Sequence, residues 1–266
     1  MADPLYERLD RLQVQSLDSY SNDVGRGNIK GGYREWAYGL LTTTGASNRA
    51  IVRDQGGTVL YIPDVAGEQA SIVSTSANDT ANGTGIQQVI FEYLDGDLNT
   101  KLEVITLNGL TPVLTIATDI RWIQSAYLYR NGALKRAAGN IDMIINSNVM
   151  VRISTNAAIS KSSLRRIPAG KQCLVGCMMA GSISGTADSQ ALIEFFTTAV
   201  DGLDMSEQGI IYSQLGFSLQ DDTADITLSY PAFVTAGALI GFIVTADKSC
   251  TVSVKWMGAV ERDNAS

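Results

Sequence analysis

The side chains best suited to catalysis are sparse in this chain. It has 266 residues and no histidine, which excludes Ser-His-Asp and Cys-His nucleophile systems, histidine-containing zinc sites and imidazole pH switches. No P-loop, kinase or Gly-x-Ser-x-Gly motif occurs, and residues 83–85 do not complete a dinucleotide-binding fingerprint. These absences predict a protein that is not an enzyme and that binds no cofactor.

Three cysteines remain, Cys173, Cys177 and Cys250. An odd, sparse count is not a disulfide framework, and the spacing of the first two misses the usual Cys-x-x-Cys ligand spacing. In a regular strand Cys173 and Cys177 share one face, because they are four residues apart. Buried free thiols are the favoured interpretation, and a redox or metal pair is the alternative.

Asp95, Asp97 and Asn99 place oxygen atoms at alternate positions, as at the start of a calcium-binding loop. The match then fails, because Thr100 stands where an EF-hand loop needs glycine and strand patterns flank the segment in place of helices. Asp, Gly and Asn favour turns by themselves. We therefore predict a plain hairpin turn and no metal site.

Two features leave a carbohydrate-binding or carbohydrate-cleaving role open. Asp221 and Asp222, with Asp225 close behind, precede a strand pattern and supply the paired carboxylates that glycoside hydrolysis needs. The aromatic rings of the chain, its three tryptophans among them, could line a sugar groove. A solvated acidic loop and core or interface rings are the favoured interpretations.

Composition narrows the class of protein further. Lys and Arg number 20 against 27 Asp and Glu, a net charge of -7, which argues against a broad nucleic-acid interface. With 45% hydrophobic and 18% charged residues, the chain is not of the disordered type. The longest apolar stretch, residues 232–244, falls short of the roughly 20 residues that span a bilayer, and the polar start is no signal peptide. We expect a soluble protein made in the cytoplasm, with no membrane or nucleic-acid partner.

Strand patterns follow one another from residue 35 onward. The clearest is at residues 251–257, where Val252, Val254 and Trp256 alternate with polar residues. Helical patterns between strands are lacking, so a βαβ architecture is disfavoured. The fold class predicted is mainly β, with antiparallel β-sandwich or barrel (jelly-roll-like) domains. The expected strands include 86–94, 101–107, 121–130, 141–145, 149–153, 172–179, 191–198 and 251–257. Residues 146–148, Asn-Ser-Asn, predict a second hairpin turn between two of them.

The chain start predicts a short helix, capped by Asp3 and with Pro4 at its first position, in which Leu5, Leu9 and Leu12 lie on one stripe. So short a helix persists only when its stripe docks, either on its own domain or on another chain.

A polar, Gly-rich link follows at residues 18–33, in which Arg26, Lys30 and the adjoining Arg34 concentrate positive charge. The link is either solvated or a basic arm lying on an acidic neighbour. We predict a helix and docking arm at 1–34, a β domain at 35–162 and a second, sandwich-like β domain at 163–266. The boundary is placed near residues 160–167, in the polar, basic stretch that ends in a turn at Gly170.

Several blocks of sequence resemble virion structural proteins of tailed bacteriophages, especially phages of marine bacteria and cyanobacteria. The first is STSANDTANGTG at residues 74–85, which continues into IQQVIFEYLD at 86–95 and LEVITLNG at 102–109. AAGNID at 137–142, IPAGK at 167–171 and YPAFV at 230–234 follow in the same order. The resemblance implies a non-enzymatic, β-rich building block of a phage particle, and no functional residue is transferred from it.

The resemblance and the physical pattern together lead to one expectation with two alternatives. The leading hypothesis is a capsid decoration (cement) protein that assembles as a homo-oligomer, by analogy a trimer, on the major capsid protein. A tail or baseplate component that anchors a fibre is the first alternative, and a carbohydrate-recognition module is the second. The expected location is the virion, after synthesis in the host bacterial cytoplasm.

Overall fold

The computed structural model describes residues 32–56, 61–184, 189–198, 211–219 and 223–262. These residues form sixteen strands and no helix, and the strand ladders are antiparallel. The predicted class of antiparallel β-sandwich is therefore confirmed, whereas the predicted N-terminal helix falls outside the described residues. The strands are β1 (Tyr33–Thr42), β2 (Ser47–Ile51), β3 (Ser71–Ser74), β4 (Ile86–Leu94), β5 (Thr100–Thr106), β6 (Val113–Leu114), β7 (Trp122–Asn131), β8 (Ile141–Ile145), β9 (Asn148–Ile153), β10 (Arg165–Arg166), β11 (Lys171–Ser184), β12 (Ala191–Thr198), β13 (Ile211–Leu219), β14 (Thr223–Val234), β15 (Leu239–Ala246) and β16 (Cys250–Arg262).

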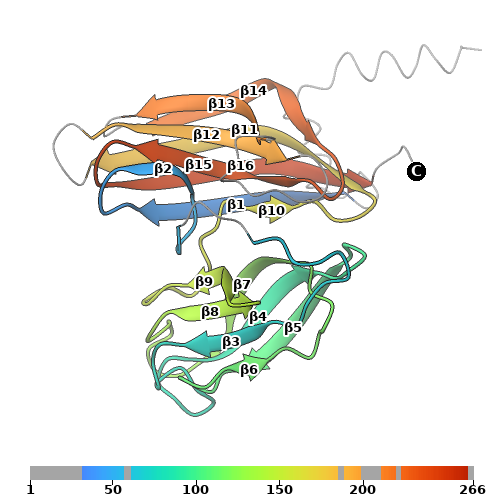
Figure 1. Ribbon diagram of the computed structural model, residues 1–266, viewed down its shortest axis with the longest axis vertical. Helices are drawn as coiled ribbons and strands as arrows, with labels where there is room; N and C mark the ends of the chain where they lie inside the picture. Colours follow the sequence, from blue (N-terminus) through green and yellow to red (C-terminus); the bar gives the residue numbers. More distant parts are fainter. Residues whose placement is uncertain (1–31, 57–60, 185–188, 199–210, 220–222, 263–266) are drawn as a thin grey trace, which may run out of the picture.

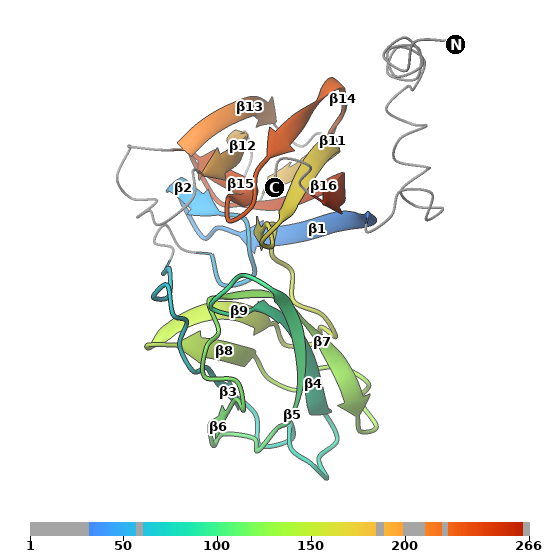
Figure 2. The ribbon, with the colours of Figure 1, turned by 90° about the vertical axis from the view of Figure 1, so that its right-hand side faces the viewer.

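The strands make two sandwiches, which lie one above the other in Figures 1 and 2. In the first, a sheet of order β1-β16-β11-β14 faces a sheet of order β10-β15-β12-β13, with β2 paired to β15. In the second, a sheet of order β6-β3-β8-β9 faces a sheet of order β5-β4-β7. We call them the terminal sandwich and the inserted sandwich, because the chain leaves the first after β2 and returns to it at β10.

This chain path differs from a simple division of the sequence into 35–162 and 163–266. Strands β1 and β2 pair with β16 and β15, so residues 33–51 lie in the sheets of the C-terminal half. The predicted boundary segment lies where the chain passes from β9 of the inserted sandwich to β10 of the terminal sandwich, but Ser163, Arg165 and Arg166 are buried there. Arg165 bonds with Glu35 and Gln124, which are distant in sequence, so a pattern in one stretch of sequence does not reveal this burial.

The core of the terminal sandwich follows from the alternation in β16. Val252, Val254 and Trp256 are buried, as predicted, and the residues between them are partly exposed. The indole Nε1–H of Trp256 donates a hydrogen bond to the carbonyl oxygen of Ser163 at 2.9 Å, so the one polar atom of this large ring is satisfied.

Strand β11 carries a β-bulge between Val175 and Cys177. The residue between them is extra relative to β16, so the alternation of the side chains shifts by one. Cys173 therefore points into the core, whereas Cys177 is partly exposed. The prediction that the two thiols share one face is wrong for this reason.

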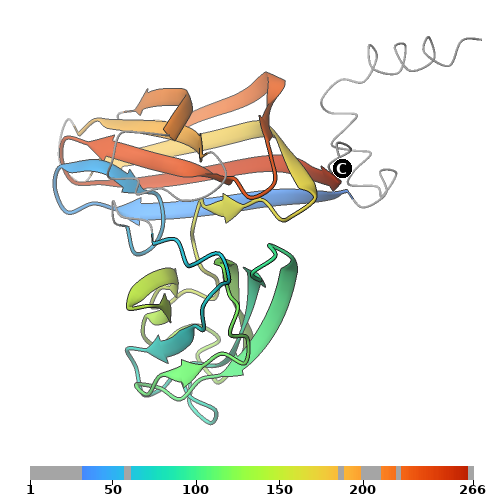
Figure 3. The same cartoon turned by 45° about the vertical axis from the view of Figure 1, so that its right-hand side comes forward.

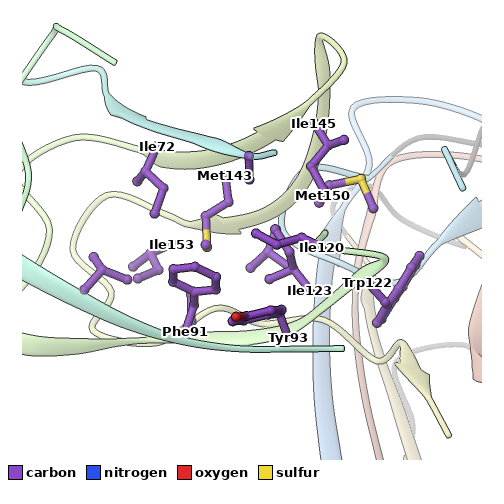
Figure 4. Close-up of a cluster of buried hydrophobic side chains, with 14 of the residues drawn as sticks. Ile72, Phe91, Tyr93, Ile120, Trp122, Ile123, Met143, Ile145, Met150 and Ile153 are labelled. Atoms are coloured by element: carbon purple, nitrogen blue, oxygen red, sulfur yellow. The ribbon is translucent and has the colours of Figure 1, made fainter. Parts of the chain in front are cut away.

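The inserted sandwich closes over the hydrophobic cluster shown in Figure 4. Phe91 and Tyr93 from β4 stack at 5.5 Å between ring centroids, facing side chains such as Met143 and Ile153 from β8 and β9. The same cluster includes Ile51 and other apolar residues of the terminal sandwich. The two sandwiches are thus joined by a continuous apolar contact.

Two predicted hairpins are confirmed in this sandwich. The Asp95 carboxylate accepts hydrogen bonds from the backbone N–H groups of Asp97 and Asn99 at the β4–β5 turn, which makes the segment an Asx-type turn. Asn146 and Ser147 join β8 to β9 with φ values of 46° and 65°, as a two-residue hairpin loop requires.

A buried carboxylate fixes the loops of the inserted sandwich. Asp79 has no exposed surface, and its Oδ1 accepts from the backbone N–H groups of Ile86 at 2.8 Å and Ala138 at 3.0 Å. Its Oδ2 accepts from the Ser74 hydroxyl at 2.7 Å and from the Gly139 N–H at 2.9 Å. Four donors from three separate segments therefore converge on one side chain.

Two glycines leave room for this arrangement. A Cβ atom at Gly85 would lie 2.1 Å from Oδ1 of Asp79, and one at Gly139 would lie 2.6 Å from the Thr75 hydroxyl oxygen. Both distances are too short for any side chain. The sequence blocks at 74–85 and 137–142, which carry the phage resemblance, are thus the two halves of one structural unit.

Replacing Asp79 by Ala should lower the free energy of unfolding by roughly 3–5 kcal/mol, because four buried donors lose their acceptor. Asp79→Asn should cost less, since the amide keeps one oxygen acceptor but presents an NH2 group to the remaining donors. Urea unfolding followed by circular dichroism measures both changes.

The matched control is Asp97→Ala, in which an exposed carboxylate of the same sandwich is removed. Its free energy of unfolding should stay within about 0.5 kcal/mol of the wild type. An Asp79→Ala chain as stable as this control would contradict the structural role given to Asp79.

Candidate functional site

The outer face of the β1-β16-β11-β14 sheet carries rows of exposed apolar side chains. The strand register sets its side chains in rows, in which Trp36 lies beside Met257 and Met257 beside Cys177. The next row sets Tyr38 beside Lys255, and Lys255 beside Met179. We call this surface the outer apolar face. Its members are Trp36, Tyr38, Leu174, Cys177, Met179, Ile183, Phe233 and Met257.

Large apolar side chains on this face are open to solvent. Trp36 is 46% exposed, Met257 41%, Phe233 55% and Ile183 70%. Single exposed apolar residues are ordinary, but a contiguous patch marks a surface that contacts another molecule. Aromatic residues and methionine are also the types enriched at protein–protein interfaces.

The local sequence explains why these residues face outward. In residues 36–41 of β1 the inward positions include Ala37 and Leu41, and the alternate positions hold Trp36 and Tyr38, so this part of the strand is apolar on both faces. In β11 the bulge shifts the alternation and turns Cys177, Met179 and Ile183 to the outside.

Positive charge accompanies the patch. Arg34 lies in β1 on the same side as Trp36, two residues away, and is exposed. The Lys255 ammonium lies 6.0 Å from the centroid of the Trp36 ring, within reach of a cation–π contact. Figure 3 shows this sheet along the upper part of the molecule, with β1 as its edge strand.

A charged cluster lies where β1 meets the inserted sandwich. The Arg165 Nε donates to Oε1 of Glu35 at 3.2 Å, and its Nη1 donates to the carbonyl oxygens of Gln124 at 2.9 Å and Leu164 at 2.8 Å. Burial raises the pKa of Glu35 and of Glu92, and the positive charge of Arg165 opposes both shifts. The positive charge of Arg165 thus stabilises the ionised form of two half-buried carboxylates.

The side chain of Gln124 completes this junction. Its Nε2 donates to the carbonyl oxygen of Arg166 at 2.5 Å, and its Oε1 accepts from the Arg166 N–H at 3.0 Å. The amide imitates one rung of a β-ladder between β7 and β10, so it fixes the inserted sandwich against the segment that carries Arg165.

The structure places only part of the interface predicted from sequence. Leu5, Leu9, Leu12, Arg26 and Lys30 lie outside the described residues. The one remaining member, Arg34, lies on the outer apolar face. The rest of this face was missed, although apolar residues on both sides of the strand at 36–41 were a signal that could have found it.

The residues considered for other chemistry are separated by the fold. Of the three tryptophans, Trp122 and Trp256 are buried in different sandwiches and only Trp36 is exposed. Asp221 and Asp222 lie outside the described residues. Within the described ranges, no three Cys, Asp or Glu residues are grouped closely enough to hold a metal ion. The same ranges contain no helix long and apolar enough to cross a membrane.

Comparison with known proteins gives little. No family model matches the chain, and no curated protein sequence matches it. Among solved structures, weak similarity is found to a chain from the infectious bursal disease virus Gt strain, at 11% identity, with 88% of this chain and 78% of that chain covered and a TM-score of 0.17. The VP2 subviral particle of infectious bursal disease virus gives 8% identity, the same coverage and a TM-score of 0.16. Scores of this size carry no weight for the fold or the function.

Replacing Glu92 by Gln should stabilise the fold at pH 8. A carboxyl whose folded pKa is raised contributes most to stability below its ordinary value of 4.5 and loses that contribution as pH rises through the folded pKa. The glutamine side chain does not ionise, so the variant does not lose this stability as pH rises. Its melting temperature should therefore exceed that of the wild type at pH 8 and approach it near pH 4.

Thermal unfolding between pH 4 and 8 measures this difference. Asp119→Asn, which removes an exposed carboxylate of the inserted sandwich, is the control and should show no such pH-dependent gain. A Glu92→Gln chain that is less stable than the wild type at pH 8 would show that Arg165 outweighs the burial of Glu92.

Proposed function

We propose that this protein is a structural component of a tailed-phage virion, a capsid decoration protein that forms a homo-oligomer, by analogy a trimer, on the head. Its partners are further copies of itself and the major capsid protein, with no role for nucleic acid or membrane. It is made in the host bacterial cytoplasm and becomes part of the virion. In this proposal it is not an enzyme and needs no cofactor.

The outer apolar face is the observation that carries the proposal. A sheet face with Trp36, Met179 and Met257 open to solvent suits contact with a neighbouring subunit better than it suits a free surface. The resemblance to phage virion proteins adds support, because its blocks at 74–85 and 137–142 meet at Asp79 and build the fold.

Two alternatives differ from this proposal in location or in the residues they need. A tail or baseplate component would use the same kind of face, so its distinction from a head protein is a matter of location. A carbohydrate-recognition module depends on grouped aromatic rings, and two of the three tryptophans are in the cores.

Copy number per virion, measured by quantitative mass spectrometry, tests whether the protein belongs to the head or to the tail. A decoration protein should be present in hundreds of copies and should co-purify with DNA-filled heads. A few copies per particle, found in tail preparations, would replace the head assignment by the tail alternative. Absence from purified virions would overturn the proposal as a whole.

Replacing Met257 by Glu should weaken attachment to phage heads that lack the protein by about tenfold or more, because the contact would bury an unpaired carboxylate. The fold should persist, since this side chain faces solvent. Co-sedimentation with the heads measures attachment, and circular dichroism measures folding.

Leu102→Glu is the matched control. It introduces the same charge at an exposed leucine in β5 of the inserted sandwich, so attachment should be unchanged. Equal attachment of the Met257→Glu and wild-type chains would exclude the outer apolar face from the contact.

A further inference from the structure

We propose that, in the free chain, residues 1–17 of the same chain cover the outer apolar face. The inference rests on the proposed function in one respect, that assembly uses this face and must displace the cover. The occupant is identified from three observations, namely where the chain enters the sheet, the size of the apolar row and the chemistry of the N-terminal sequence.

The N-terminal segment is tethered beside the face. The chain enters β1 at Tyr33, and β1 is the edge strand of the sheet. Trp36 lies three residues further on, about 10 Å along the strand. A polar, Gly-rich link of residues 18–32 has an average span of roughly 20 Å, so the segment before it stays within reach. Such tethering gives an effective concentration of about 1 mM.

The dimensions of the two partners agree. If residues 4–12 are helical, as their sequence predicts, the stripe from Leu5 to Leu12 rises about 10 Å. The row Trp36–Met257–Cys177 crosses two strand spacings, also about 10 Å. The leucine stripe is therefore about as long as the three-strand row is wide, so a helix lying across these strands could contact the whole row.

Each partner supplies what the other lacks. A single helix this short is not stable in water without an apolar surface to pack on. An apolar sheet face left open on a soluble chain is prone to non-specific association. Docking Leu5, Leu9 and Leu12 on the outer apolar face removes both problems at once.

Cys177 gives a natural probe of this contact. It is partly exposed at the centre of the face, whereas Cys173 and Cys250 are buried. Burial also raises the pKa of the Cys173 thiol, which suppresses its reactivity further. Alkylation of the native chain should therefore occur mainly at Cys177 and should report on whether the face is covered.

The test places a second thiol on the proposed cover. In a Leu9→Cys chain at low micromolar concentration, mild oxidation should form a disulfide between that residue and Cys177 within one chain. Mass spectrometry of the non-reduced peptides identifies the pair, and gel mobility shows whether one chain or two are joined. Glu7→Cys is the matched control, because position 7 lies on the opposite side of the predicted helix, and its disulfide with Cys177 should form much more slowly.

A second variant removes the cover without new thiols. Replacing Leu5, Leu9 and Leu12 together by Asp should leave the sandwiches folded and raise the rate of Cys177 alkylation roughly fivefold or more. A disulfide that joins two chains would overturn the inference in favour of arm exchange between copies. An unchanged alkylation rate together with no preference for Leu9→Cys over Glu7→Cys would show that the segment does not dock here.

These outcomes are independent of the virion assignment. They are measured on the isolated chain, whereas the proposed function is tested by copy number and attachment to heads. If the face proves covered but the protein is absent from virions, the docking of residues 1–17 stands and the proposed virion function is overturned.

Discussion

The buried carboxylate of Asp79 is the constraint on which the inserted sandwich depends. An ionised group without water needs several donors, and four supply it here. The hydrogen bonds to Asp79 fix the start of β4 and the loop before β8. The Asp79 carboxylate also leaves no space for a side chain at Gly85. The sandwich so ordered presents Gln124 to β10, and the amide of Gln124 in turn holds the segment that bears Arg165. Asp79 thus holds the loops of the inserted sandwich together, and Gln124 holds that sandwich to β10.

The terminal sandwich shows how one alternating pattern produces both a core and an exposed apolar face. Trp256 and its inward neighbours fill the space between the sheets, and Met257 one position later belongs to the outer apolar face. The bulge in β11 adds Cys177 and Met179 to that face by shifting the alternation. The same strands therefore carry both the buried core and the exposed apolar side chains, and each residue's burial is decided by which side of the sheet it occupies.

Much of the local structure could be predicted from the sequence, and much of the long-range structure could not. The alternation at 251–257 and the turn at Asn146 gave strands and a hairpin correctly, because both signals involve neighbouring residues. The pairing of β1 with β16 joins segments about two hundred residues apart, and no local pattern encodes it. Asp79 stands in a polar stretch typical of a solvated loop, and its burial follows from donors that are distant in sequence. The basic segment at Arg165 joins the two sandwiches, but its burial could not be predicted, because the carboxylate and carbonyl around it come from β1 and β7.

The separation of β1 from β16 has a consequence for synthesis on the ribosome. The inserted sandwich consists of one continuous run, 71–153, and is complete long before the C-terminal strands are translated. Strand β1 emerges first but has no partner in its sheet until residues 250–262 leave the exit tunnel. Because long-range pairing is slow and exposes unpaired strands, the nascent chain must carry Trp36 and Tyr38 unpaired through most of translation. Expression yield should therefore depend on chaperones that bind nascent apolar segments more than the stability of the finished fold would indicate.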